Sequence, residues 1–376
     1  MAYLYFDSAA TAKTNEYAKE AALRAFEEYG NPSSLHGAGV AARRLVEDAR
    51  EQVARALRCD AAQITFVSSG TEANNQALFG LAKARKKRGN TILSTDSEHP
   101  SVEEPLKALE AEGFRVVRIS TRGGVLDLEQ VKRELAEPIA FVTMMGANNE
   151  TGAVYDLAGV RRLMTAAGCD APFHSDCVQA FLKTENRKYT SICDLITLSA
   201  HKIGGLKGAG ALYVGPKVRN LPAYLLGGGQ EKGLRSGTEN VPAIAAFGAA
   251  AEACVKDGTR LQRIAQLRQQ VIDGIEGSGI ILHIPPVNLP GILHISIPGV
   301  LSSWSLNALS AKGICVSAGS ACSAKEKKKG NRVLSAYGLP QQEIETSLRI
   351  SFGPHNTKEE CALLCHALQE CAKLKK

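Results

Sequence analysis

Short apolar segments alternate with amphipathic helical patterns between about residues 60 and 215. The apolar segments are rich in β-branched residues, as buried strands are. The segments between them, such as PLKALEAEG and LEQVKRELA, carry apolar residues at helical spacing. This repeated alternation predicts an α/β fold with a mainly parallel sheet and helices on both of its faces. The predicted strands are residues 64–68, 90–94, 115–120, 139–146, 194–200 and 210–215.

The pattern changes to long helices over residues 238–277. Shorter strand and helix patterns follow, at residues 292–298, 303–313, 347–353 and 358–373. Because these segments form a group of their own, we predict two domains. The large domain comprises residues 15–258. Residues 1–14 and 259–376 form a smaller α+β domain.

The composition is that of an ordinary globular protein. Of the 376 residues 44% are hydrophobic, which is enough for a large core. The net charge of +7 comes from basic residues interspersed with acids, and aromatic residues make up 5%. A surface for nucleic acid needs basic residues with stacking aromatics, so we expect none. No apolar stretch has the length of a membrane span and the opening segment lacks a leader pattern, which favours a cytoplasmic protein without membrane contact.

The ten cysteines are scattered and include no CxxC pair. Neither a zinc site nor a disulfide framework is therefore indicated, and we expect no metal and reduced thiols. Cys361 and Cys365 have the spacing of a ligand pair. Leu364 and Leu368 fall on the same helical stripe, however, and this favours two cysteines packed in the core.

A lysine stands where a predicted strand meets a glycine-rich turn. Residues 194–214 read DLITLSAHKIGGLKGAGALYV and place Lys202 just beyond the strand. Burial at such a position lowers the pKa of a lysine, and the free amine is the form that makes a Schiff base with an aldehyde. The alternative is an ordinary surface lysine.

A carboxylate occupies a similar position in PFHSDCVQA, residues 172–180. Asp176 follows a predicted strand, and Gln179 comes three residues later. Such a carboxylate can hold a protonated pyridine nitrogen, the arrangement that makes pyridoxal phosphate an acceptor of electrons. The alternative is that Asp176 caps the next helix.

Two further loops follow predicted strands. In FVSSGTEANN, residues 66–75, hydroxyl groups precede a helix whose first N–H groups suit a phosphate, although the same letters also suit a simple capping box from Thr71 to Asn74. In SEHPS, residues 97–101, His99 precedes another helix; a lone histidine is often only structural. Ligands bind beyond the carboxyl ends of strands in such sheets, so these loops are expected at one site.

Cys322 lies in ICVSAGSACSA, residues 314–324. Glycine and small polar neighbours predict a loop that bends easily and leaves the sulfur accessible. A cysteine meant for the core would have apolar neighbours. The alternative is a small residue in a tight turn. The lysines that follow, at 325 and 327–329, indicate either a solvated charge run or a contact for an acidic acceptor protein.

The chain resembles the cysteine desulfurases, fold-type-I pyridoxal phosphate enzymes of the class V aminotransferase group. The resemblance extends almost from end to end and implies a large domain with a seven-stranded sheet and a smaller domain that carries the cysteine loop. SAGSACSA resembles the NifS and IscS branch, and the RxGHHCA pattern of the SufS branch is absent. The matching motifs are residues 5–11, 30–37, 68–75, 98–101, 148–152, 175–179, 199–214, 227–241, 317–324 and 347–353.

The resemblance implies a role for each cofactor-binding residue. Lys202 would be the Schiff-base lysine and proton shuttle, Asp176 the partner of the pyridine nitrogen, and Gln179 a donor to the ring hydroxyl. His99 would stack on the ring and assist proton transfer. Further implied contacts with pyridoxal phosphate come from Gly70, Thr71, Ser199 and His201 at the phosphate, from Asn149, and from Thr238 of the neighbouring subunit of a homodimer.

The resemblance also implies the reaction. Asn149 and Arg349 would orient the carboxylate of L-cysteine, since an arginine fork matches two oxygens. The thiolate of Cys322 would attack the substrate sulfur and carry it away as a persulfide, leaving L-alanine. A sulfur-acceptor protein, either a scaffold for iron–sulfur clusters or an enzyme of tRNA thiolation, would receive it. The alternatives are a related lyase such as a selenocysteine lyase, an aminotransferase that uses no thiol, and a non-catalytic binding protein.

Overall fold

The computed structural model describes residues 3–184, 189–318 and 331–374. Within these ranges, no helix combines the length and the apolarity that crossing a membrane requires. Cys322 and the lysines that follow it lie outside the described residues.

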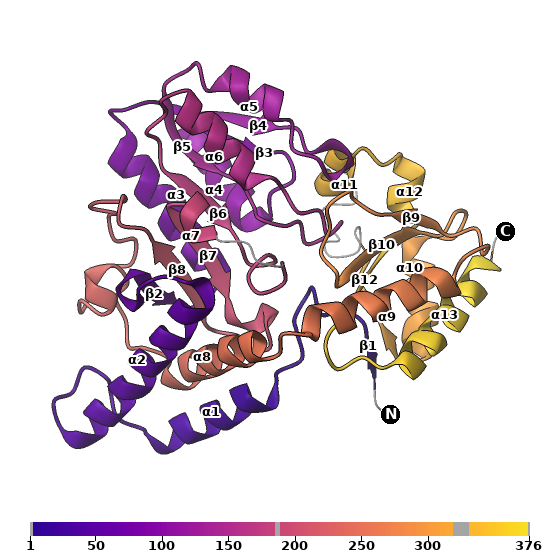
Figure 1. Ribbon diagram of the computed structural model, residues 1–376, viewed down its shortest axis with the longest axis horizontal. Coiled ribbons are helices and arrows are strands. Elements are labelled where there is room, and N and C mark those ends of the chain that lie inside the picture. Colours follow the sequence, from indigo (N-terminus) through magenta and orange to yellow (C-terminus); the bar gives the residue numbers. More distant parts are fainter. Residues whose placement is uncertain (1–2, 185–188, 319–330, 375–376) are drawn as a thin grey trace.

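A seven-stranded sheet forms the centre of the larger part of the molecule (Figure 1). Its strand order is β2-β8-β7-β6-β5-β3-β4. Only β8 runs antiparallel to its neighbours β2 and β7, and the other pairs are parallel. The predicted mainly parallel sheet is therefore confirmed. The strands are β2 (Ile64–Val67), β3 (Thr91–Thr95), β4 (Arg115–Ile119), β5 (Ile139–Thr143), β6 (Phe173–Asp176), β7 (Leu195–Ser199) and β8 (Gly210–Val214).

Helices cover both faces of this sheet, as the alternating pattern predicts, and bury a separate apolar cluster on each face. One cluster lies between the sheet and α3 and α4, and the other includes residues of α1, α2, α6 and α8. The sequence patterns considered above did not include α1 and α2. The helices are α1 (Glu16–Glu27), α2 (Gly37–Leu57), α3 (Gly70–Arg85), α4 (Pro100–Ala111), α5 (Leu128–Glu134), α6 (Leu157–Ala166), α7 (Tyr189–Ile192) and α8 (Val241–Lys256).

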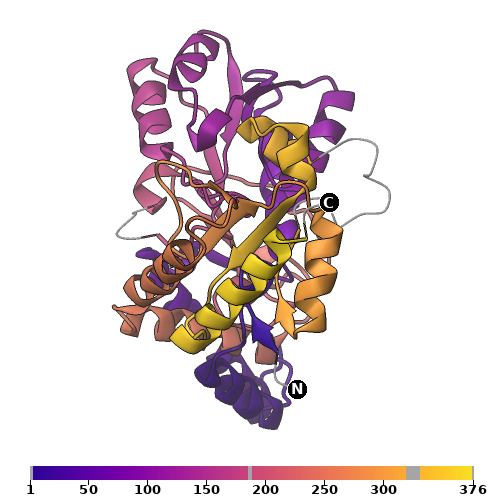
Figure 2. The same cartoon turned by 90° about the vertical axis from the view of Figure 1, so that its right-hand side faces the viewer.

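A second, smaller sheet lies beside the first (Figure 2). It has the antiparallel order β12-β10-β9, and its core is a separate apolar cluster of residues from the C-terminal third of the chain and Phe6. Cys361 and Cys365 belong to this cluster, which confirms them as core cysteines. The elements are β9 (Ile281–His283), β10 (Ile292–Ser296), β12 (Ser347–Ser351), α9 (Arg260–Gly274), α10 (Ser302–Ala311), α11 (Arg332–Tyr337), α12 (Gln341–Glu345) and α13 (Lys358–Ala372).

The start of the chain joins the two sheets. Strand β1 (Leu4–Tyr5) pairs with β11 (Ile314–Cys315), and Asp7 bridges to Ser351 at the end of β12. Two residues later, Ala9 belongs to the core of the large sheet. The division at residues 14 and 258 stays a prediction.

A buried ion pair fixes the loop between β8 and α8 to α2. Glu231 has only 3% of its side chain exposed and accepts hydrogen bonds from Arg50 at 2.7 and 2.8 Å and from the backbone N–H of Phe66 at 2.8 Å. The substitution Glu231→Gln leaves the buried guanidinium of Arg50 without its full counter-charge. We expect the free energy of unfolding to fall by about 3 kcal/mol, measured by denaturant titration. The exposed pair of Glu51 with Arg55 supplies the control, because Glu51→Gln is expected to change stability by less than about 1 kcal/mol.

Candidate active site

Several of the predicted site residues meet at one edge of the large sheet, where the parallel strands end. Asp176 is the last residue of β6, and Ser199 is the last residue of β7. The short 3-10 turn η3 (Ala200–Lys202) follows β7, and His99 is the N-cap of α4 after β3. The crevice beyond the carboxyl ends of parallel strands is the usual ligand site of such sheets.

A chain of hydrogen bonds joins Asp176 to His99. Asn74 donates through Nδ2 to Oδ2 of Asp176 and to Oγ of Ser101, both at 2.8 Å. Ser101 Oγ lies 2.8 Å from Nδ1 of His99. The alternative role of Asp176 as a helix cap does not apply, because the residues that directly follow it, 177–184, form turns and not a helix. Asn74 and Ser101 are functional candidates that the sequence reasoning missed.

Asp176 is a buried carboxylate that forms no ion pair among the described residues, although the amine of Lys202 is close enough to feel its charge. It is 5% exposed, and Oδ1 accepts only the N–H of Val178, at 2.9 Å. Within the described residues it forms no ion pair with a basic side chain. A buried carboxylate without a counter-charge is costly, and a cation bound in the site would relieve the cost.

The amine of Lys202 lies inside the molecule. It donates to the carbonyl oxygens of Ala9 and Ala10, both at 2.8 Å. Burial, together with nearby Arg349, lowers the pKa of Lys202 to about 8, although Asp176 and two other carboxylates oppose the shift. About a tenth of the amine is therefore free at pH 7, compared with less than about a thousandth for an ordinary lysine, as the proposed role requires.

Gln179 lies beside Lys202 and is held by a second lysine. It donates through Nε2 to the carbonyl of Ala9 at 2.8 Å, and its Oε1 accepts from Nζ of Lys183 at 2.8 Å. Because a lysine is only a donor, this contact fixes which end of the Gln179 amide carries the N–H groups. The sequence reasoning did not single out Lys183, although it follows Gln179 by four residues.

The groups expected at a phosphate gather at the start of α3. Ser69 caps this helix by accepting from the N–H of Glu72, so the capping box from Thr71 to Asn74 is not formed. A side chain at Gly70 would come within 2.8 Å of Val178, which explains the glycine. Thr71 lines a cavity of about 550 Å³ together with His99 and Ser101.

His201 and Thr238 complete the phosphate set predicted from the resemblance. His201 contacts Thr11 Oγ1 through Nδ1 at 3.1 Å, and burial with nearby lysines lowers its pKa to about 4, so it is neutral at physiological pH. The structure does not bring Thr238 to the other candidates within one chain. It is exposed and has no hydrogen bond to them in the described ranges.

Arg349 on β12 faces two carboxylates. Its Nη1 donates to Oε1 of Glu150 at 3.1 Å and to the carbonyl of Asn149 at 3.0 Å, and its Nη2 donates to Oδ1 of Asp7 at 3.0 Å. The side-chain amide of Asn149 donates to the same oxygen of Glu150, at 2.8 Å. The two residues expected to bind the substrate carboxylate therefore already converge on one carboxylate oxygen.

The described residues on each side of the Cys322 segment are attached at this site. Before it, Ser317 donates to Asp7 Oδ1 at 2.9 Å and exchanges backbone hydrogen bonds with Arg349. After it, Arg332 donates to the carbonyls of Asp96 and Glu98, next to His99. The nucleophile predicted at residue 322 thus belongs to a segment whose described neighbours both lie at the site.

Comparison with known proteins agrees with this geometry. The aminotransferase class-V family model matches residues 4–364. A cysteine desulfurase IscS 1 of Archaeoglobus fulgidus is 36% identical over 97% of this chain and 95% of its own. The chain belongs to the cysteine desulfurases of the class-V aminotransferase family. Another cysteine desulfurase, of Trichormus azollae, is 37% identical over 98% of this chain and 93% of its own.

Solved structures of cysteine desulfurase relatives have the same fold. A NifS-like protein superposes with a TM-score of 0.92 at 33% identity, covering 99% of both chains. The NifS-like protein from Rickettsia africae has a TM-score of 0.87 at 30% identity, covering 99% of this chain and 100% of its own. These likenesses confirm the predicted fold type I, which together with the family implies pyridoxal phosphate.

The residues of this cysteine desulfurase fit that cofactor. A protonated pyridine nitrogen would supply the counter-charge that buried Asp176 lacks. An amine at Lys202 bound only to carbonyls is available to an aldehyde. The first turn of α3, with the hydroxyl groups of Thr71 and Ser199 nearby, has the N–H donors that a phosphate needs.

Proposed function

We propose that the chain removes the sulfur from L-cysteine, producing L-alanine and a persulfide on Cys322. One observation carries the proposal. Lys202, Asp176 and Arg349 bring a free amine, a carboxylate without an ion pair and an arginine guanidinium together at one sheet edge. Bound pyridoxal phosphate would supply an aldehyde for the substrate amine and a ring that accepts an electron pair. A non-catalytic binding protein would have no reason to combine these three groups.

The site residues of the chain have separate roles in the reaction. Lys202 removes a proton from the substrate α-carbon, for which its lowered pKa suits it. Asp176, oriented by Asn74, would hold the protonated ring nitrogen of the bound cofactor, and Gln179 would donate to its ring hydroxyl. Asn149 and Arg349 orient the substrate carboxylate. It would replace the carboxylate of Glu150 as the partner of the Arg349 guanidinium.

Cys322 carries out the sulfur transfer. Its thiolate attacks the sulfur of the substrate, so that a sulfur–sulfur bond forms and the carbon–sulfur bond breaks. The electron pair left on the β-carbon takes up a proton, and the α-carbon regains the proton that Lys202 removed, which gives alanine. Burial lowers the pKa of His99, so its neutral ring can accept the thiol proton when the loop reaches it.

The reaction is tested by incubating the enzyme with L-cysteine. We expect one alanine for each sulfur released, and mass spectrometry of the peptide that contains Cys322 should show one added sulfur atom. Alanine without sulfur on this cysteine would favour the lyase alternative. A transamination product in place of alanine would favour an aminotransferase.

The pH dependence of cofactor attachment follows from the pKa of Lys202. The free amine is the reactive form, and it increases as the pH rises through about 8, well below the usual 10.5 of lysine. We expect the rate at which pyridoxal phosphate attaches to the cofactor-free protein to rise with pH and level off above about 8. The measurement is the growth of the absorption band of the bound cofactor. A midpoint near 10 would show that Lys202 is not shifted.

We also propose a homodimer in which Thr238 reaches the neighbouring site. Large apolar side chains on α1 are exposed in the single chain, with Tyr17 at 67%, Leu23 at 65% and Phe26 at 64%. The buried side of α1 consists instead of alanines that pack against α8. Exposed large apolar side chains of this kind are typical of an interface. The double substitution Leu23→Glu and Phe26→Glu, one helical turn apart, is expected to give a monomer in analytical ultracentrifugation, whereas Lys132→Glu, at an exposed position of α5 away from α1, should leave the dimer intact.

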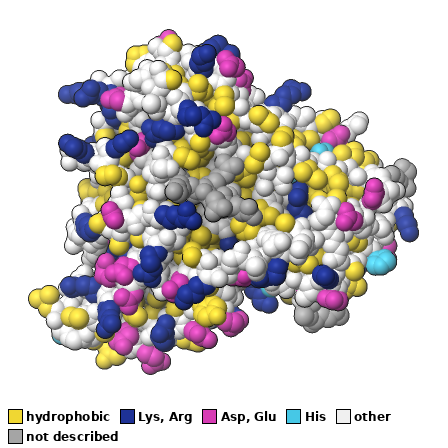
Figure 3. Space-filling view, viewed as in Figure 1, with side chains coloured by type: hydrophobic (Ala, Val, Ile, Leu, Met, Phe, Trp, Pro, Cys, Tyr) yellow, Lys and Arg dark blue, Asp and Glu magenta, His cyan; other side chains and the backbone are white. Residues whose placement is uncertain are grey.

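The persulfide is proposed to pass to a protein that serves iron–sulfur cluster assembly or tRNA thiolation. A cytoplasmic location is part of the proposal, since the cysteines of the described residues are all free thiols, as a reducing compartment would keep them. Direct binding to nucleic acid is not part of it. Figure 3 shows both signs of charge side by side over α1 and α2, without a continuous basic surface there.

A further inference from the structure

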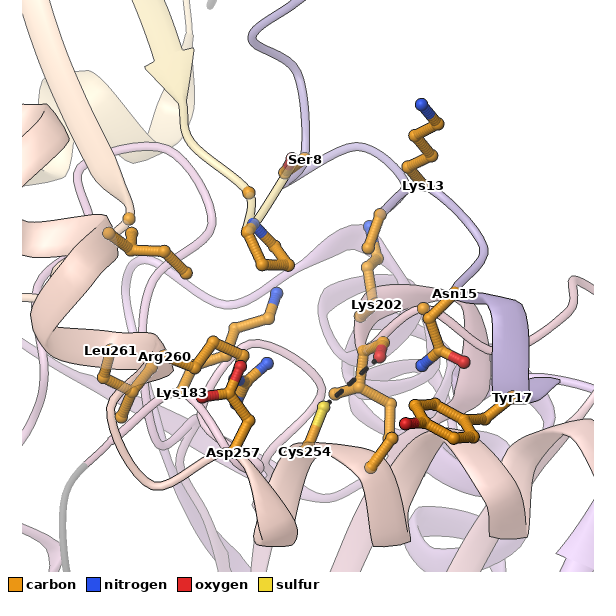
Figure 4. A pocket seen from close by; sticks show the side chains of 18 of the residues that line it. Ser8, Lys13, Asn15, Tyr17, Lys183, Lys202, Cys254, Asp257, Arg260 and Leu261 are labelled. Carbon is orange, nitrogen blue, oxygen red and sulfur yellow. Dashed lines mark hydrogen bonds between the residues drawn. The ribbon is translucent and has the colours of Figure 1, made fainter. Parts of the chain in front are cut away.

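A second cavity lies behind Lys202, away from the proposed cofactor. It has a volume of about 600 Å³ and is lined by the start of α1, the end of α8, the start of α9 and the ends of strands in the small sheet (Figure 4). Lys202 and Gln179 form part of its wall, but Asp176 and His99 do not. This volume is in the range that binds small molecules.

Of the five further basic side chains that line this cavity, Lys183 and Arg260 lie on the side of Gln179 and Leu182 (Figure 4). Lys183 donates through Nζ to Gln179, and its pKa is lowered well below the usual value by burial and by the nearby charges of Lys202 and Arg260. Arg260 is 9% exposed and donates through Nη2 to the carbonyl of Leu182, but its Nε has no hydrogen-bond partner. A buried donor without an acceptor is costly and indicates a missing partner.

Three acidic side chains line the same cavity: Glu20, which is exposed on α1, and Asp257 and Glu252, which are engaged with other residues. Asp257 pairs with Arg263 at 2.6 Å. Glu252 accepts from Gln52 at 3.0 Å and pairs with Lys256 at 3.3 Å. Within the described ranges, neither Lys183, Lys202 nor Arg260 pairs with a carboxylate. The inner wall of the cavity therefore has an excess of positive charge.

Part of the cavity wall is apolar. Ile264 of α9, Leu289 before β10 and Phe352 after β12 contribute to it, and all three belong to the apolar clusters. Ile264 lies one helical turn from Arg260. A cavity that has basic groups next to hydrocarbon suits a ligand with an acidic group and an apolar part.

We propose that this cavity binds a small organic carboxylate, with its acidic group on Lys183 and Arg260 and its hydrocarbon part on Ile264, Leu289 and Phe352. The carboxylate would accept from Nε of Arg260, and its negative charge would favour the protonated, charged form of Lys183. The site is separate from the substrate fork at Arg349, and the proposal does not depend on the reaction that the enzyme catalyses. Because Lys202 borders the cavity, such a ligand places a negative charge near the catalytic amine.

The anionic dye 8-anilinonaphthalene-1-sulfonate is a suitable fluorescent probe for the holoenzyme. We expect hexanoate to displace the dye, and hexanamide, which has the same shape without the charge, to displace it at least about tenfold less well. The substitution Lys183→Met should weaken the binding of both anions about tenfold or more, because a charge-assisted hydrogen bond is lost. Lys217→Met, at an exposed position outside the cavity, should leave their affinities unchanged.

Arg260→Met should act like Lys183→Met, and Arg260→Lys should restore most of the affinity. Thermal unfolding shows which variants are folded. If Arg260→Met is unfolded, the test depends on Lys183→Met. Equal displacement by hexanoate and hexanamide would overturn the proposal. So would unchanged affinity in Lys183→Met, because the anion would then bind elsewhere, for example on Arg349.

Discussion

Replacing Lys202 with alanine is expected to lower the rate of alanine formation from L-cysteine by about a thousandfold or more, since a positioned general base alone contributes factors of 10² to 10⁴. The structure supplies the reason. The amine of Lys202 is held at two carbonyl oxygens in the interior, next to Asp176 and Arg349, and burial has lowered its pKa to about 8. The measurement is alanine production with the cofactor in excess.

A further substitution tests whether Lys202 acts as a base or only through its positive charge, and another serves as the control. Lys202→Arg keeps the positive charge but cannot give up its proton near neutral pH, so we expect a loss similar to that in Lys202→Ala. Lys207→Ala, at an exposed position five residues further along, should retain nearly full activity. Activity in Lys202→Arg within about tenfold of the unmodified enzyme would contradict the role of Lys202 as a base.

The substitution Cys322→Ser is expected to abolish the transfer of sulfur to a persulfide. A hydroxyl group is a far weaker nucleophile than a thiolate near neutral pH, so we expect alanine formation to fall by at least about a hundredfold. Binding of L-cysteine should be preserved, because the groups that orient it, Asn149 and Arg349, are unchanged. Spectroscopic titration of the bound cofactor with L-cysteine measures that binding separately from turnover.

Cys169→Ser is the matched control. This partly buried cysteine follows the C-terminal end of α6, away from the site residues. Its loss should leave sulfur transfer intact. If Cys322→Ser still releases sulfur from L-cysteine at the rate of the unmodified enzyme, the enzyme is a lyase that needs no thiol. If it binds no L-cysteine, the thiol has a structural role instead.

The position of the site could be predicted from the sequence because it depends on local patterns. Asp176 and Lys202 each follow an apolar segment, and the ends of parallel strands meet at one edge. The same reasoning places His99 there. These predictions required no knowledge of which strands are neighbours, only that the sheet is parallel.

The partners of these residues could not be predicted in the same way, because their contacts join distant segments. Asn74 reaches Asp176 from α3, and its position within a helix pattern suggests only a cap or a core residue. Lys183 resembles a surface lysine until the fold buries it against Gln179 and Arg260. A polar residue within an otherwise apolar helix face was the one available signal for Asn74. For Lys183 there was no comparable signal.

The opening residues of the chain connect the two ends of the site directly. Asp7 is bonded to Arg349, and the carbonyls of Ala9 and Ala10, two and three residues later, hold the amine of Lys202. No flexible linker separates these contacts. Any movement of β12 that accompanies the arrival of a substrate carboxylate would therefore be transmitted along residues 7–10 and would alter the hydrogen bonds that set how readily Lys202 accepts a proton.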